Sequence, residues 1–320
     1  MKSLNHGDHR DHGEQHVPVP SSRPDPQGLP AVATRSDSAG SEQSTGTVPS
    51  PASSSVVSVV SVVSVVNKSG EKRDLATKVA RLRELLGRIE REHSPAAFAN
   101  SFGTEDMLLT DLIAREFRGI QIFTLDTLRL PKETYELMHE ARKKYGFRLV
   151  TYTPIIEVAE DFVARHGAFS MYESVENRKS CCYIRKVEPL NRALALKKAW
   201  LTGLRREQAP SRKDLTESEF DADHNLTKFN PLIDWSEDDV WAYIRANGVP
   251  TNALHDKGYP SIGCEPCTRA VKPGEDPRAG RWWWEQEAKN GKGGQQECGL
   301  HVKAVEMSGL KSAAKTGATA

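Results

Sequence analysis

The sequence carries almost no net charge and no long hydrophobic run, and both shortages exclude classes of protein. Lys and Arg total 44 against 43 Asp and Glu, a formal net charge of +1 over 320 residues, so no global field marks nucleic acid or an anionic membrane as the partner. The only apolar run, SVVSVVSVVSVV from Ser55 to Val66, is broken by serine at every third position and is shorter than the roughly 20 residues of a membrane helix. We therefore expect neither nucleic-acid binding nor a membrane span.

The first part of the sequence also lacks the pattern of a secretory signal. The first fifty residues are polar, rich in His, Ser, Pro and Gly, and show no apolar segment behind a basic start. The five cysteines are an odd number, which argues against a disulfide framework and for metal binding or catalysis in a reducing compartment. We expect a cytoplasmic protein.

Composition predicts three parts of the chain. Residues 1–70 lack apolar periodicity and predict a disordered, low-complexity tail. Residues 71–255 predict the folded core, and residues 256–320, rich in Gly, Pro, Trp, Lys and Cys, predict loops and a C-terminal tail. Four histidines in the N-terminal part are interpreted as solvated side chains, because nothing would hold their imidazoles around a metal; they are His6, His9, His12 and His16.

The core alternates strand and helix patterns, which predicts a doubly wound α/β domain with a parallel sheet. In such sheets ligands bind beyond the carboxyl ends of the strands. Ser236 is a predicted helix cap, with Asp239 three residues later. The strand patterns lie at 96–102, 120–126, 148–154 and 198–204, and the helix patterns at 74–89, 105–117, 131–144 and 236–246.

The turn SFGTED after the first strand is a candidate anion-binding loop. Gly103 lets the backbone approach an anion, Ser101 offers a hydroxyl, and the next helix begins with free N–H groups. Taken alone, a glycine-containing turn between strand and helix is more often a plain connection. Basic residues gather in CCYIRKVEP, RREQAPSRK and PRAGRWWW. They serve either solubility or an oxyanion-rich ligand, which arginine can grip through two N–H groups.

Four cysteines are spaced for one shared centre. Cys181 and Cys182 are adjacent, and Cys264 and Cys267 form a C-x-x-C within GCEPC. The spacing leaves an iron–sulfur cluster and a structural zinc open. Cys298 stands apart in ECGLH, where polar neighbours favour a reactive thiol over a small buried hydrophobe.

Together these segments resemble the phosphoadenylyl- and adenylyl-sulfate reductase family. The resemblance runs roughly from Phe98 to His301. It implies a Rossmann-like fold of the adenine nucleotide alpha-hydrolase type and the reduction of adenylyl sulfate (APS) to sulfite and AMP in assimilatory sulfate reduction, which feeds cysteine biosynthesis. It is carried by SFGTEDMLL, LDTLRLPKETYEL, CCYIRKVEPLNRAL, WLTGLRREQ, NPLIDWSEDDVWAYI, GYPSIGCEPCTRAV, RAGRWWWE and ECGLH.

The resemblance also implies roles for single residues. The four paired cysteines would bind one [4Fe-4S] cluster per chain, because the branch that uses the 3'-phosphorylated substrate (PAPS) generally lacks them. Lys186 would lie between cluster and substrate. The other implied substrate-binding residues are Ser101 and Thr127 at the nucleotide, Gly203 and Arg212 in the same pocket, and Arg278 and Arg281 at the phosphosulfate.

Two departures from the family pattern bear on these assignments. After WLTGLRREQ the chain reads APSRK, one residue shorter than the pattern, so Arg212 is assigned across a shortened loop. SFGTED also differs from the SGGxDS form of relatives that cleave ATP to pyrophosphate. That difference favours a reductase over an adenylating enzyme.

The implied mechanism uses Cys298 as the nucleophile. Its thiolate attacks the sulfur of APS, AMP leaves, and the resulting S-sulfocysteine is resolved by thioredoxin or glutaredoxin, because the other four cysteines are committed to the cluster. Three alternatives stay open: a PAPS-preferring or dual-specificity reductase, an ATP-consuming thiolation or adenylating enzyme, and a non-catalytic cluster or zinc protein that senses nucleotide. A homo-oligomer is compatible with the sequence.

Overall fold

A computed structural model describes residues 65–66, 72–73, 75–209 and 212–288 of the chain. The N-terminal histidines and Cys298 lie outside the described residues. The strands are β1 (Val65–Val66), β2 (Lys72–Arg73), β3 (Ala96–Ala99), β4 (Gln121–Leu125), β5 (Val150–Tyr152), β6 (Ala199–Leu201), β7 (Ser218–Asp221) and β8 (Leu226–Phe229). The helices are α1 (Leu75–Glu92), α2 (Thr104–Glu116), α3 (Lys132–Tyr145), α4 (Ile156–His166), α5 (Val175–Cys182), α6 (Glu188–Leu194), α7 (Glu237–Asn247) and α8 (Trp283–Ala288). A π-helical turn, η2 (Tyr183–Val187), joins α5 to α6, and the short 3₁₀ turns are η1 (Ser170–Tyr172), η3 (Arg206–Gln208), η5 (His255–Lys257) and η6 (Glu265–Cys267).

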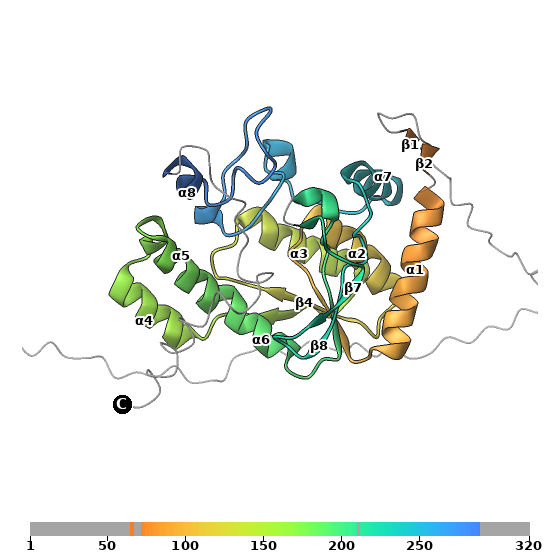
Figure 1. The fold of residues 1–320 in the computed structure, drawn as a ribbon, viewed down its shortest axis with the longest axis horizontal. Coiled ribbons are helices and arrows are strands. Elements are labelled where there is room, and N and C mark those ends of the chain that lie inside the picture. Colours follow the sequence, from red (N-terminus) through yellow and green to blue (C-terminus); the bar gives the residue numbers. More distant parts are fainter. Residues whose placement is uncertain (1–64, 67–71, 74, 210–211, 289–320) are drawn as a thin grey trace, which may run out of the picture. The chain divides into compact units, whose positions relative to one another are not determined.

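One sheet organises the fold (Figure 1). Its strand order is β5-β4-β3-β6-β8-β7. Neighbouring strands from β5 to β8 are parallel, and only β7 pairs antiparallel with β8. The predicted doubly wound parallel sheet is therefore confirmed, with an antiparallel edge strand added. The chain runs outward from β3 to β5 and then crosses to β6, so the order reverses between β3 and β6 and leaves a crevice beyond their carboxyl ends.

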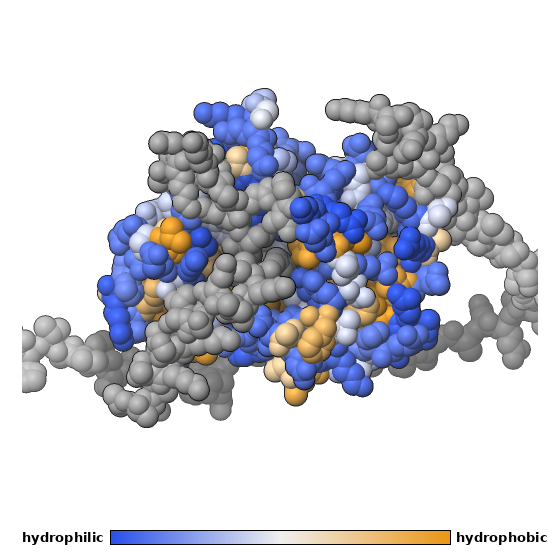
Figure 2. Space-filling view, in the orientation of Figure 1, coloured by the Kyte–Doolittle hydropathy of each residue, from blue (hydrophilic) through white to orange (hydrophobic). Residues whose placement is uncertain are grey.

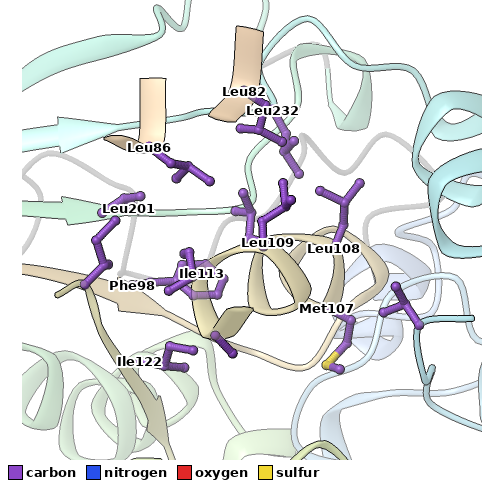
Figure 3. Close-up of a cluster of buried hydrophobic side chains, with 14 of the residues drawn as sticks. Leu82, Leu86, Phe98, Met107, Leu108, Leu109, Ile113, Ile122, Leu201 and Leu232 are labelled. Atoms are coloured by element: carbon purple, nitrogen blue, oxygen red, sulfur yellow. The ribbon is translucent and has the colours of Figure 1, made fainter. Parts of the chain in front are cut away.

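Helices cover both faces of the sheet because successive side chains of a strand point in opposite directions. Phe98 of β3 enters the large core formed with α1, α2, α3 and α7, where it lies among Leu86, Leu109 and Ile113 (Figure 3). The preceding Ala97 enters a smaller core on the other face, formed with α6. The central strands are thus buried on both sides, which fixes the strand ends that carry the site.

Helix α7 begins with the cap predicted from sequence. Ser236 Oγ accepts a hydrogen bond from the Asp239 N–H at 3.1 Å, and the Asp239 carboxylate accepts one from the Ser236 N–H at 2.8 Å. We expect Ser236→Ala to lower the free energy of unfolding by about 1 kcal/mol, measured by urea denaturation. The control is Ser218→Ala on the exposed strand β7, for which a change within about 0.5 kcal/mol is expected. Equal changes in the free energy of unfolding in the two variants would contradict a stabilising role of the Ser236 cap.

Exposed hydrophobic side chains form small separate patches on the face drawn in Figure 2, which is otherwise mainly hydrophilic. Phe169 and Tyr172 are among the exposed ones, and their rings stack with centres 6.2 Å apart. The Tyr172 hydroxyl donates to the Pro266 carbonyl at 2.5 Å. This hydrogen bond links the C-x-x-C loop to the segment before α5. Within the described ranges, no helix combines the length and hydrophobicity needed to cross a membrane.

Candidate active site

A cavity of about 790 Å³ opens beyond the carboxyl ends of β3, β4 and β6. Its walls come from the loops after these strands, from η2 and from the segments around 258–263 and 276–281. The fold thus places the cavity at the crevice where the strand order reverses. All of the substrate contacts implied by sequence line it: Ser101, Thr127, Lys186, Gly203, Arg212, Arg278 and Arg281. The structure brings these residues together, and their contact with a substrate stays a prediction.

A buried carboxylate joins the loops after β3 and β6. The Asp106 carboxylate accepts hydrogen bonds from the Ser101 N–H and the Ser101 hydroxyl, each at 2.6 Å, and one from the Gly203 backbone. A Cβ on Gly203 would collide with this carboxylate. Gly203 is therefore needed for the close approach of the two loops, a role that the sequence did not reveal.

Burial raises the pKa of Asp106 to about 6, from 3.8, against the opposing effect of the hydrogen bonds from Ser101. Because the folded pKa lies above the unfolded one, the folded state binds more protons between about pH 4 and pH 6, and this group's contribution to stability falls as the pH rises through that window. Asp106→Asn should remove that contribution. We therefore expect the free energy of unfolding of the variant, relative to that of wild type, to increase from pH 4 to pH 6 in urea denaturation.

The control for this pH prediction is Asp239→Asn. Burial tends to raise the pKa of Asp239, but the hydrogen bond from Lys78 and those from Ser236 lower it below its usual value. A lowered pKa contributes stability above the unfolded pKa that is lost as the pH falls. The two variants should therefore change the pH slope in opposite directions, and a change of the same sign in both would contradict the assignment.

Two carboxylates of the cavity wall lie beside Arg205. Arg205, which is 5% exposed, donates from Nε to Glu105 at 2.8 Å and lies 3.3 Å from a carboxylate oxygen of Glu207 through Nη1. Burial acts to raise the pKa of Glu105, but the charge and hydrogen bond of Arg205, together with hydrogen bonds from Thr104 and the backbone, hold that pKa below its usual value. Arg205 lies within WLTGLRREQ, yet sequence reasoning did not single it out, because its partner Glu105 is 100 residues away.

A second arginine of the cavity wall, Arg281, is held by its surroundings. The buried guanidinium of Arg281 donates from Nη1 to the Ser261 hydroxyl at 3.3 Å and to the Ile262 carbonyl at 3.4 Å. Its central carbon lies 4.9 Å from the centre of the Trp282 ring. A Cβ on Gly263 would collide with this guanidinium. Backbone, hydroxyl and indole therefore hold Arg281 in one place in the cavity wall.

The four paired cysteines line a small cleft next to the large cavity. Cys181, Cys182, Cys264 and Cys267 all line the cleft, and none is in a disulfide. The Cys264 thiol donates to the Thr127 hydroxyl at 3.2 Å. Lys186 lines both the cleft and the large cavity. Residues from three distant segments therefore connect the cysteines to the cavity.

An irregular helix presents the adjacent cysteines and Lys186 together. Pro189 follows η2, and because proline has no N–H, the hydrogen-bond ladder is interrupted there. Such π-helical turns are frequent at functional sites. Cys182 and Lys186 are four residues apart, and the buried Arg185 donates to the Thr127 carbonyl at 2.9 Å. The turn thus directs side chains of one helix to both cleft and cavity.

The cleft is cationic and poor in water-exposed surface. Arg129, Arg178 and Arg185 line it beside Lys186. Burial acts to raise the pKa of Cys264, but the charge of Lys186, the hydrogen bond with Thr127 and the charges of Arg281 and Arg129 together lower it. Burial raises the pKa of Cys267 to about 12. Convergent thiols offset by cations are a ligand set suited to iron–sulfur clusters and soft metals.

The described residues contain no group of three or more His, Cys, Asp or Glu side chains already placed around a metal ion. The cysteines therefore fit a metal or cluster by donor chemistry and location, and their side chains would reorient to ligate it. A buried ion pair near them was missed by sequence reasoning: Arg178 Nε donates to Glu285 at 2.7 Å, with both side chains 5% exposed. This pair joins α5, which carries the adjacent cysteines, to α8, and no short-range pattern could have revealed it.

Comparisons with known proteins agree with this geometry. The phosphoadenosine phosphosulfate reductase domain matches residues 95–270. An adenosine 5'-phosphosulfate reductase from Burkholderia cepacia is 52% identical over 232 residues, 72% of this chain and 90% of the relative. One of the same name from Allochromatium vinosum is 52% identical over 227 residues, 71% of this chain and 86% of the relative. The crystal structure of a Candida auris phosphoadenylyl-sulfate reductase in a phosphate complex is 32% identical, with a TM-score of 0.51, and covers 57% of this chain and 88% of that one.

Proposed function

The chain belongs to the phosphoadenosine phosphosulfate reductase family, and on that premise we propose that it reduces APS to sulfite and AMP in sulfate assimilation. The named relatives at 52% identity are adenosine 5'-phosphosulfate reductases, whereas the phosphoadenylyl-sulfate reductase is 32% identical. The proposed enzyme is thus an oxidoreductase acting on a sulfur group, with APS preferred to PAPS.

One observation carries the proposal: a nucleotide-sized cavity at a topological switch point shares Lys186 with a cleft of four thiols. Arg278, Arg281 and Lys186 in the cavity wall suit a phosphosulfate, because guanidinium and ammonium groups neutralise its charge and arginine can donate two hydrogen bonds at once. Ser101 and Thr127 also line the cavity, where they would contact the nucleotide. Gly203 and Arg212 belong to the same wall.

In the proposed reaction the thiolate of Cys298 attacks the sulfur of APS. A bond forms between the cysteine sulfur and the sulfonate sulfur, the bond from that sulfur to the bridging oxygen breaks, and AMP leaves with the oxygen. Lys186 and Arg281 would stabilise the charge that builds up on the leaving phosphate. An external dithiol, for which we propose thioredoxin or glutaredoxin, then resolves the S-sulfocysteine: sulfite leaves, the dithiol becomes a disulfide, and the thiolate of Cys298 is restored.

We also propose that the four cysteines of the cleft bind one [4Fe-4S] cluster. When bound, the cluster would place a fixed charge near the sulfate end of the substrate. The cationic residues around the cleft offset the negative charge of the thiolates. Anaerobic purification, iron and sulfide analysis and Mössbauer spectroscopy test this proposal: a [4Fe-4S] signal in wild type that is lost in Cys264→Ser and Cys267→Ser supports it, and bound zinc without iron contradicts it.

Trapping the covalent intermediate tests the proposed function. The protein is incubated with APS without any thiol donor, digested and analysed by mass spectrometry. We expect one sulfonate group on the peptide that contains Cys298 and one AMP released per group transferred. Labelling of Cys181 or Cys264 instead, or a nucleotide bound to the protein, would contradict the proposed reaction.

A further inference from the structure

His255 has an imidazole nitrogen that the described contacts leave without a partner. It lies in η5 and lines the large cavity. Its Nδ1 is 2.9 Å from the carbonyl oxygen of Tyr259. Because a carbonyl only accepts, Nδ1 must carry the proton of that hydrogen bond. The other ring nitrogen, Nε2, is buried and has no hydrogen-bond partner.

The surroundings keep the ring neutral and in place. Burial lowers the pKa of His255, although its bond to Tyr259 and nearby carboxylates oppose the shift. In the neutral ring Nε2 is therefore an acceptor. The Trp241 ring meets the imidazole edge-on at 87°, with ring centres 5.8 Å apart. A buried acceptor without a donor is unfavourable, and a ligand with a suitable N–H or O–H would remove that penalty.

The position of His255 in the cavity limits what that ligand group can be. The charged groups acting on it are the carboxylates of Glu105, Asp256 and Glu237, of which Glu105 and Glu237 also line the cavity. The cationic residues Lys186 and Arg281 line the same cavity. A nucleotide whose anionic end binds those cations leaves its uncharged nucleoside for the rest of the wall, which includes His255. Arg205 pairs with Glu105, so the repulsion of a phosphate attached to that nucleoside rests on Glu237.

We propose that His255 contacts the nucleoside and sets nucleotide specificity: Nε2 accepts a hydrogen bond from a ribose hydroxyl, and Glu237 disfavours a phosphate on the same ribose. This inference rests on the proposed function. It gives a structural reason for preferring APS, which has both ribose hydroxyls, to PAPS, in which one carries a phosphate.

Calorimetric titration with AMP and its analogues tests the role of His255 without turnover. The variant is His255→Phe, which keeps a flat ring, and the control is His139→Phe on the exposed side of α3. We expect His255→Phe to weaken AMP binding about 3- to 10-fold, with partial recovery in His255→Gln and no change in the control. In wild type, 2'-deoxy-AMP or 3'-deoxy-AMP should show the same loss, and His255→Phe should not distinguish that analogue from AMP.

The analogues also separate the outcomes. The deoxy analogue that loses affinity identifies the hydroxyl, whereas a loss restricted to purine riboside monophosphate, which lacks the adenine amine, would overturn the ribose contact. Additive losses from variant and analogue would overturn it as well. Glu237→Gln should raise the affinity for adenosine 3',5'-bisphosphate relative to AMP, and an unchanged ratio would contradict the electrostatic part. Wild type that does not bind AMP would instead contradict the proposed function itself.

Discussion

Cys298→Ser should abolish sulfite release from APS, with a loss of at least about a thousandfold, because removing the nucleophile of a covalent mechanism removes the reaction path itself. Serine keeps the size of the side chain, but its hydroxyl is not ionised near neutral pH and cannot form the S-sulfo intermediate. The measurement is thioredoxin-dependent sulfite formation by anaerobically purified protein.

Controls for this variant distinguish chemistry from folding. AMP affinity should be unchanged, because the residues that line the cavity are untouched. Iron content and visible absorption should also be unchanged, because the four cysteines of the cleft are separate from Cys298. A Cys298→Ser protein that still releases sulfite at the wild-type rate would show that another group is the nucleophile.

The second large effect is expected from Arg281→Gln. The guanidinium is held by Ser261, Ile262 and the Trp282 ring, so a charge fixed toward the phosphosulfate costs no reorganisation during the reaction. We expect a fall in kcat/KM for APS of about 10²- to 10³-fold. Arg281→Lys should lie between wild type and Arg281→Gln, because lysine keeps the charge and loses the paired N–H geometry.

Gly263→Ala provides a matched variant for Arg281. The added Cβ would displace the guanidinium, so this substitution should lower kcat/KM in the same direction while leaving Arg281 in the sequence. In both variants AMP affinity should fall less than APS affinity, because AMP lacks the sulfate. Equal losses for AMP and APS would place Arg281 at the nucleotide, contrary to the proposed role.

The sequence predicted those strands and helices whose apolar residues recur at regular spacing. The central strands β3, β4 and β6 and the helices α1, α2, α3 and α7 have clear apolar spacing, and Ser236 with Asp239 forms the predicted cap. Helices α4 to α6 and the β7–β8 hairpin were not predicted. Helix α5 shows only two buried residues, Arg178 and Cys181, so its sequence has no apolar stripe for a period to reveal.

The candidate site was predicted through its motifs, and its electrostatics were not. Ser101, Thr127 and Gly203 lie at the cavity because their motifs follow strand ends. The implied contacts Lys186, Arg278 and Arg281 reach it from a helical turn and from the segment before α8. The partners that fix these motifs come from distant segments: Arg205 pairs with Glu105, and Arg178 with Glu285. His255 stands in a turn with no periodic pattern, and only the folded structure shows which of its nitrogens is satisfied.

Steady-state turnover tests the central claim most directly. Anaerobically purified protein is supplied with APS, reduced thioredoxin and its reductase, and sulfite and AMP are quantified, with PAPS and ATP tested in parallel. We expect equal amounts of sulfite and AMP from APS, strict dependence on the dithiol, slower reaction with PAPS and no consumption of ATP. Absence of sulfite, or release of pyrophosphate from ATP in its place, would contradict the assignment as a reductase of adenylyl sulfate.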